Sequence, residues 1–69
     1  MTLDQMRMLV QIAESGSVLA AAENLHRTQP TVSVAIRKLE AEFDLQILDR
    51  NSYRATLTPA GEALYRQAR

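Results

Sequence analysis

The chain contains two neighbouring stripes of apolar residues that each repeat at helical spacing. The first stripe consists of Val18, Ala21, Ala22 and Leu25, at i, i+3, i+4 and i+7. The second stripe consists of Val32, Ile36, Leu39 and Phe43. Thr28 is placed to cap the second helix, and Pro30 suits its first turn, where the missing N–H leaves no bond unmade. The pattern therefore predicts two helices, at about 18–25 and 29–43, joined by a short turn.

The residues before these stripes predict a first helix over about residues 3–14. Thr2 and Gln5 have the spacing of a capping box, in which each side chain bonds the other residue's backbone. The apolar stripe of this helix consists of Leu3, Met6, Leu9, Val10 and Ala13. Gly16 is placed to end the helix in a left-handed conformation, and Ser17 follows as the N-cap of the next helix.

The pattern changes after residue 44, where short β-tolerant stretches replace the helical stripes. Residues 45–50 and 53–57 are typical of two strands, and the asparagine and serine between them favour a turn. Thr58 is then followed by a proline, which predicts a fourth helix over residues 59–69. Three helices, a two-stranded hairpin and a linker helix make a mainly α fold, the winged helix-turn-helix, which can place the start of its third helix against DNA base edges.

Composition limits the kinds of protein that this chain can be. Its 69 residues suffice for one small domain, and 46% hydrophobic residues without any cysteine mean that packing alone must hold it. No long apolar run or signal-peptide pattern is present, so we expect a soluble, cytoplasmic chain without a membrane partner. His26 is the single histidine and no glycine-rich phosphate loop occurs, so we expect no enzyme, no metal site and no cofactor.

Charge gives conflicting indications about a nucleic-acid partner. Eight basic and eight acidic residues leave a formal net charge of zero, whereas DNA-binding domains are often strongly basic. The basic residues are nevertheless grouped, since residues 27–38 hold three and residues 50–61 hold two, with no acid in either stretch. One basic face suffices for phosphate contact, although charge alone favours ordinary solvated side chains.

Short motifs along the whole chain resemble those of one protein family. They are Leu3, Gln5 and Leu9, with the stretches Ala13–Ser17, Ala21–Leu25, Thr28–Ser33, Ile36–Glu40, Leu48–Arg50 and Leu57–Gly61. In this order and without a gap, they resemble the N-terminal DNA-binding domain of LysR-type transcriptional regulators. Three positions depart from the family pattern. Val34 stands where a long polar or basic residue is common, Asp44 stands where glycine is common, and the wing tip has a single arginine.

The resemblance implies a set of DNA-contacting residues. Base contacts would come from Gln29, Pro30, Thr31 and Ser33, at the start of the third helix. Contacts to the DNA backbone and minor groove would come from Arg27, Thr28, Arg37, Lys38, Arg50 and Arg54. The residue types fit, because glutamine pairs with adenine and arginine with phosphate. The competing interpretation is structural, with capping by the hydroxyl residues, a helix-surface ion pair of Lys38 with Glu42, and solvated arginines.

The resemblance also implies an assembly and a larger parent protein. Residues 1–58 would form the DNA-binding head and residues 59–69 the start of a linker helix, before a missing C-terminal domain that binds a small-molecule effector. Two copies would pair through the linker helix as a homodimer, with higher association in the full-length protein, and bind double-stranded DNA in the bacterial cytoplasm. The slim face expected to pair consists of Ala60, Ala63, Leu64, Gln67 and Ala68. The alternative is a winged-helix module that binds protein and not DNA.

Overall fold

The computed structural model describes residues 1–49 and 56–69 of the chain. Its elements are α1 (Leu3–Ser15), α2 (Val18–Asn24), α3 (Gln29–Phe43), β1 (Leu48–Asp49), β2 (Thr56–Leu57) and α4 (Pro59–Ala68). Their order confirms the predicted mainly α, winged helix-turn-helix fold, and every helix begins at the residue that the sequence predicts. The first strand begins later than predicted, because residues 45–47 form an irregular segment that leads into β1. The predicted strand residues 50 and 53–55 lie outside the described residues.

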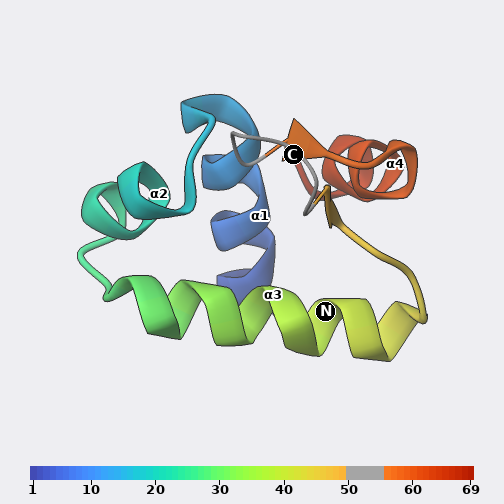
Figure 1. Ribbon diagram of the computed structural model, residues 1–69, viewed down its shortest axis with the longest axis horizontal. Coiled ribbons are helices and arrows are strands. Elements are labelled where there is room, and N and C mark those ends of the chain that lie inside the picture. Colours follow the sequence, from blue (N-terminus) through green and yellow to red (C-terminus); the bar gives the residue numbers. More distant parts are fainter. Residues whose placement is uncertain (50–55) are drawn as a thin grey trace.

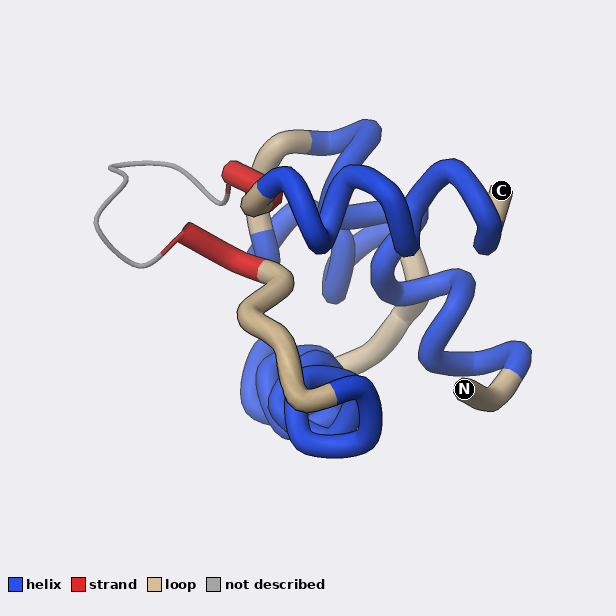
Figure 2. Tube along the Cα trace, turned by 90° about the vertical axis from the view of Figure 1, so that its right-hand side faces the viewer, coloured by secondary structure: helices blue, strands red, loops and turns tan. Residues whose placement is uncertain are grey.

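The other helices are arranged around α1, which stands over the middle of α3. In Figure 1, α3 lies along one side of the molecule, and α2 and α4 lie above its two ends on either side of α1. The strands pair antiparallel, with Leu48 opposite Leu57 and Asp49 opposite Thr56, and Figure 2 shows them at the edge of the helical body. This arrangement covers α3 from one side only.

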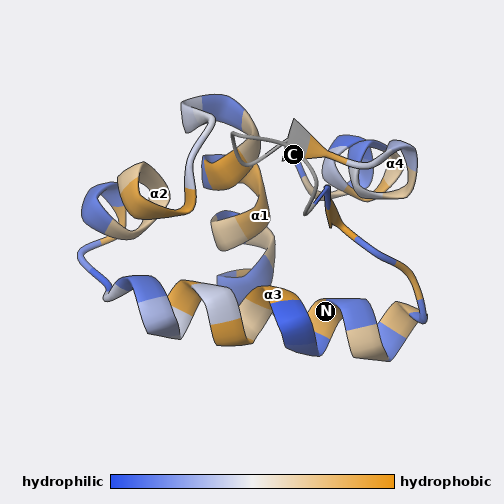
Figure 3. Ribbon diagram, in the orientation of Figure 1, coloured by the Kyte–Doolittle hydropathy of each residue, from blue (hydrophilic) through white to orange (hydrophobic). Residues whose placement is uncertain are grey.

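Ten buried apolar side chains form the core, and no polar or charged side chain is buried among the described residues. The ten are Met8, Leu9, Ile12, Ala21, Ala22, Val32, Ile36, Leu39, Ile47 and Leu64. Figure 3 shows apolar and polar segments alternating along α3, as expected for a helix with one buried side. Two residues predicted in the apolar stripes do not reach the core, since Leu3 is 61% and Phe43 42% exposed. They are the first residue of α1 and the last of α3, where the stripe runs past the neighbouring helices.

Side-chain caps fix the start of every helix. The four capping residues are Thr2, Ser17, Thr28 and Thr58, and each hydroxyl accepts a hydrogen bond from the N–H three residues later. The capping box of α1 is complete, because the Gln5 side chain accepts a hydrogen bond from the Thr2 N–H at 2.9 Å. The helix starts are therefore set by local interactions that the sequence encodes directly.

Left-handed residues end α1 and α3. Gly16 has φ 79°, and Asp44 has φ 51° while its N–H donates to the Glu40 carbonyl. Asp44, which stands where glycine is common in the family, thus adopts the left-handed conformation that glycine would favour. His26, in the turn before α3, has φ 56° and is a second non-glycine residue in this region, which the sequence does not predict.

The segment before β1 joins α3, the wing and α4 at one point, the Ile47 junction (Glu40, Ile47, Thr58 and Gly61). The Glu40 carboxylate accepts hydrogen bonds from the N–H groups of Ile47, at 2.8 Å, and Leu48, at 3.4 Å. The Ile47 carbonyl in turn accepts from the Thr58 N–H at 2.9 Å. Gly61 lies so close that a Cβ there would stand 3.1 Å from the Ile47 carbonyl carbon. The base of the wing is therefore held from two helices.

The fourth helix packs into the same core as the first three. Leu64 is only 7% exposed and belongs to the core, and the Tyr65 hydroxyl donates to the Glu14 carboxylate of α1 at 3.3 Å. The predicted division after residue 58 is consequently not a packing boundary, because the head needs Leu64 to complete its core.

Candidate nucleic-acid interface

The outer face of α3 is the side of this helix turned away from the core, and it consists of Gln29, Pro30, Ser33, Val34 and Arg37. Ser33 is half-buried and the other four residues are exposed. The opposite side is anchored by three fully buried residues, Val32, Ile36 and Leu39. The structure thus places the predicted base-contacting residues Gln29, Pro30 and Ser33 on one solvent-facing surface of a firmly held helix.

The threonines at the start of α3 serve its cap. Thr28 Oγ1 accepts a hydrogen bond from the Thr31 N–H at 3.3 Å, and the two hydroxyl oxygens lie 2.8 Å apart in a further hydrogen bond. The capping interpretation is therefore correct for this pair. Each hydroxyl still has bonding capacity left for an external group, because a hydroxyl is one donor and two acceptors.

Three polar side chains of α3 are free to meet an external ligand. Gln29, Arg37 and Lys38 are exposed and make no side-chain hydrogen bond or ion pair with the described part of the chain. The alternative pair of Lys38 with Glu42 does not form, because Glu42 binds the terminal ammonium of the chain at 2.8 Å. An amide and two cations therefore stand unpaired along the helix.

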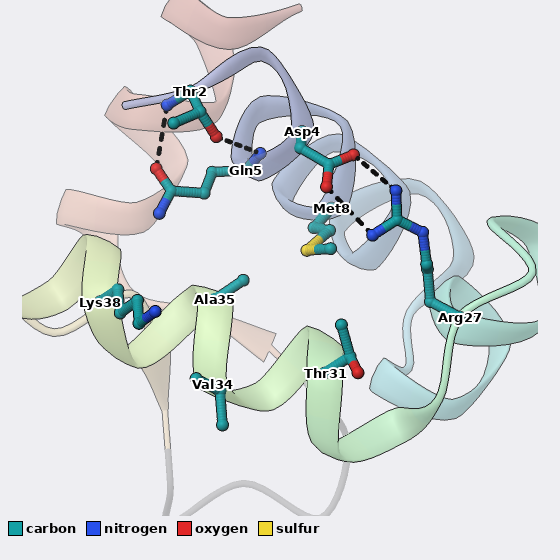
Figure 4. Close-up of a pocket in the computed structure, with 9 residues that line it drawn as sticks. All are labelled: Thr2, Asp4, Gln5, Met8, Arg27, Thr31, Val34, Ala35 and Lys38. Carbon is teal, nitrogen blue, oxygen red and sulfur yellow. Dashed lines mark hydrogen bonds and ion pairs between the residues drawn. The ribbon is translucent and has the colours of Figure 1, made fainter.

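Arg27, just before α3, is held by an acidic residue of α1. Its guanidinium meets the Asp4 carboxylate edge to edge, with Nη1–Oδ2 at 3.0 Å and Nη2–Oδ1 at 3.1 Å. The pair lines a depression of about 350 Å³ between α1 and α3. Figure 4 shows Arg27 and Asp4 together with two other lining residues, Thr31 and Lys38, on α3. Arg27 is thus near the candidate interface but already has a partner.

The remaining predicted DNA contacts are in the wing. Arg50 and Arg54 lie outside the described residues, as does the predicted turn between the strands. The described strands end at Asp49 and resume at Thr56, which pair with each other.

The face of α4 expected to pair with a second copy is only partly at the surface. Ala63 and Gln67 are exposed, while Ala60 and Ala68 are half-buried. Leu64 must be removed from this face, because its side chain is buried in the core of its own head. The prediction from the sequence mistook a core position for a surface position, since both read as one apolar stripe on a helix.

Other kinds of site find little support in the described ranges 1–49 and 56–69. No group of three or more His, Cys, Asp or Glu side chains gathers there in a way that could hold a metal ion. No helix within these ranges is long and apolar enough to cross a membrane.

Sequence reasoning missed Asp4 at this surface. Asp4 lies in the first turn of α1, and its contact with Arg27 joins residues 23 positions apart. A long-range ion pair has no local pattern, so nothing in the sequence reveals it. Val34, which departs from the family pattern, is 46% exposed at the middle of the outer face.

Comparison with known proteins gives a consistent match over the chain. The profile of the family described as "Bacterial regulatory helix-turn-helix protein, lysR family" matches residues 3–62. A "Probable RuBisCO transcriptional regulator" of Chlorokybus atmophyticus is 45% identical over 65 residues, which are 94% of this chain and 21% of that protein. The chain therefore spans about a fifth of the length of the curated relatives it matches.

Two solved structures that superpose on the chain contain DNA. A BenM DNA-binding domain in complex with benA site 1 DNA has a TM-score of 0.93 and 37% identity, over 99% of this chain and 76% of that one. A CbnR DNA-binding domain in complex with DNA has a TM-score of 0.90 and 36% identity, over 99% of this chain and 78% of that one. The fold, the sequence and the exposed α3 surface all agree with these matches.

Proposed function

Because the chain belongs to the LysR family of bacterial regulatory helix-turn-helix proteins, we propose that it reads double-stranded DNA by inserting α3 into the major groove. The observation that carries the proposal is the outer face of α3, which is exposed and has an unpaired amide at its start. A major groove about 12 Å wide admits one α-helix. The buried side of α3 holds the helix to the head while its outer face enters the groove. The two superposable domains were solved in complex with DNA, which supports DNA binding by this chain.

Base recognition is assigned to the outer face of α3. The Gln29 amide can pair through two hydrogen bonds with adenine, and the Ser33 hydroxyl can donate to or accept from a neighbouring base. Pro30 and Val34 add apolar surface that suits the methyl group of thymine. The side chains therefore favour a site that contains A·T pairs, recognised through hydrogen bonds and through apolar contact with the thymine methyl group.

Backbone contacts are assigned to the cationic residues around this face. Arg37 and Lys38 have no partner within the described ranges and can each neutralise a phosphate. Thr28 and Thr31 add hydroxyl groups at the positive end of α3, which favours phosphate. For the wing, we propose that Arg50 and Arg54 follow the adjacent backbone and minor groove.

The parent protein is proposed to be a transcriptional regulator that works as a dimer in the bacterial cytoplasm. A C-terminal domain would bind a small-molecule effector, and α4 would continue as the helix that joins two heads. The surface available for pairing at this end consists of Ala60, Ala63, Gln67 and Ala68. Two heads related by a twofold axis would read two similar half-sites.

The alternative of a protein-binding module is less well supported. A neutral net charge is compatible with it. The outer face of α3, however, carries a cation and no acid, and the free amide and hydroxyl groups suit base edges better than an apolar partner surface.

The family assignment, and not the lack of a catalytic cluster, is the reason to regard the chain as a non-enzyme.

The proposal is tested by separating base contacts from backbone contacts. A site selected from random-sequence duplexes serves as the specific DNA and a scrambled version as the competitor. Gln29→Ala should weaken binding to the selected site by about 1–3 kcal/mol and to the scrambled duplex much less, because the amide reads a base. Arg37→Ala should weaken both duplexes similarly and reduce the slope of log affinity against log salt by about one.

Gln46→Ala is the matched control, because this exposed glutamine lies beyond the far end of α3. Its loss should leave both affinities unchanged. If Gln29→Ala lowered the affinity for selected and scrambled DNA equally, α3 would not be reading sequence. If the wild-type chain selected no duplex at all, the protein-binding alternative would replace this proposal.

A further inference from the structure

Asp4 binds the guanidinium of Arg27, the cation that directly precedes the N-cap of α3. Two N–O distances of 3.0 and 3.1 Å join both terminal nitrogens of the guanidinium to both oxygens of the carboxylate. A pair of this geometry uses the fork that arginine would otherwise present to a phosphate. The residue best placed by sequence to clamp the DNA backbone before α3 is therefore bound to an anion of its own chain.

The pair stands where DNA would pass. Arg27 directly precedes Thr28, the cap of α3, and lines the depression between α1 and α3 together with Thr31 and Lys38 (Figure 4). A duplex that holds the outer face of α3 in its groove brings a phosphate strand past the start of the helix.

The ion pair is also weak enough that a DNA phosphate can compete with Asp4 for Arg27. The side chains of Arg27 and Asp4 are 43% and 50% exposed, so water and salt screen their attraction. Neither residue is part of the core, and no second carboxylate within the described ranges pairs with Arg27. The contact therefore contributes little to folding, while its charges lie where they affect DNA binding.

We propose that Asp4 attenuates backbone affinity by engaging the guanidinium of Arg27, so that the start of α3 contributes less than one full phosphate contact. This inference rests on the proposed function, because it concerns how strongly the same surface holds DNA of any sequence. Its effect is to lower the sequence-independent share of binding and leave base reading by α3 unchanged. A regulator gains from this, because non-specific sites compete with its operator.

The experiment compares Asp4→Asn with Glu62→Gln. Asn keeps the size of Asp4 but removes the negative charge that holds Arg27. Glu62 is likewise an exposed acid in the first turn of a helix, on α4 and away from α3, so its substitution controls for net charge and for the helix dipole. Affinities for the selected and the scrambled duplex are measured over a range of salt concentrations by fluorescence anisotropy.

Asp4→Asn should raise the affinity for both duplexes about two- to fivefold at low salt, in keeping with the strength of an exposed ion pair. The slope of log affinity against log salt should steepen by up to about one, because the released guanidinium can then make a full phosphate contact. The ratio of selected to scrambled binding should not change. Glu62→Gln should give the wild-type slope.

A second pair of variants tests whether Arg27 carries the effect. Arg27→Ala and the double variant Asp4→Asn with Arg27→Ala should have equal salt slopes, because no guanidinium remains to be released. A steepening that persisted without Arg27 would mean that Asp4 acts through repulsion alone, and the proposal would fail. A lower affinity of Asp4→Asn would overturn it as well, since Asp4 would then be orienting Arg27 for the phosphate. In either case wild-type binding to DNA would still stand, so failure here is distinguishable from failure of the proposed function.

Discussion

Gly61→Ala should destabilise the head, although alanine favours a helix and glycine does not. Gly61 is buried in α4, and a Cβ at this position would lie 3.1 Å from the carbonyl carbon and 3.2 Å from the Cα of Ile47, and closer still to the carbonyl oxygen. That carbonyl cannot turn aside, because it accepts a hydrogen bond from the Thr58 N–H and belongs to a fully buried residue. The clash must then be relieved by moving α4 away from the Ile47 junction.

The expected loss follows from two opposing effects. Overfilling a packed site costs about 1–3 kcal/mol. Replacing glycine by alanine inside a helix returns about 1 kcal/mol. The clash involves backbone atoms and not a flexible side chain, so we expect the upper part of that range and a net loss of about 1–2 kcal/mol of unfolding free energy. For a head of this size, such a loss lowers the melting temperature by several degrees.

Urea unfolding followed by circular dichroism measures this change. Ala63→Gly, at an exposed position of the same helix, measures the difference in helix propensity between alanine and glycine without a clash. That difference can then be subtracted from the change measured for Gly61→Ala. The slope against urea should stay the same, because the fold is unchanged. An unfolding free energy of Gly61→Ala equal to or above that of the wild type would refute the reasoning, because it would mean that α4 shifts freely against the wing.

Substitutions at two positions test the C-terminal end of α3. Asp44→Gly should stabilise the head by about 0.5–1 kcal/mol, because glycine adopts φ 51° without strain, and matched denaturation curves would check it; a loss would mean that the carboxylate makes a bond that matters. Glu40→Ala should cost about 1–3 kcal/mol, because the N–H groups of Ile47 and Leu48 lose their acceptor, whereas Glu40→Gln keeps an acceptor and should lose less. Equal losses for both Glu40 variants in thermal unfolding would contradict this role of the hydrogen bonds.

The helices were predictable from the sequence because their boundaries are set locally. A hydroxyl residue at each start bonds an N–H three residues later, and this relation can be read from spacing alone. The end of α3 was predictable for the same reason, since Asp44 interrupts the apolar stripe and tolerates the left-handed region. His26 adopts that region too, but the turn that requires it depends on how α2 and α3 cross.

The wing and the core were less predictable because they depend on contacts between distant residues. Ile47 reads as part of a strand, yet it is a core residue held by Glu40 and by the start of α4. Leu64 reads as part of a pairing surface, yet it completes the core. At the candidate interface, spacing predicted the outer face of α3 correctly, whereas the partner of Arg27 could be found only in three dimensions.

The burial of Leu64 has a mechanical consequence for any protein in which α4 continues into a longer helix. Leu64 in the core, Gly61 against Ile47 and the bond from Tyr65 to Glu14 fasten the helix at three points. These contacts tie α4 to the head, so a turn of a longer α4 would be passed on to α3. In a dimer of the kind proposed above, the angle at which the two α4 helices cross would then set the spacing of the two α3 helices on DNA.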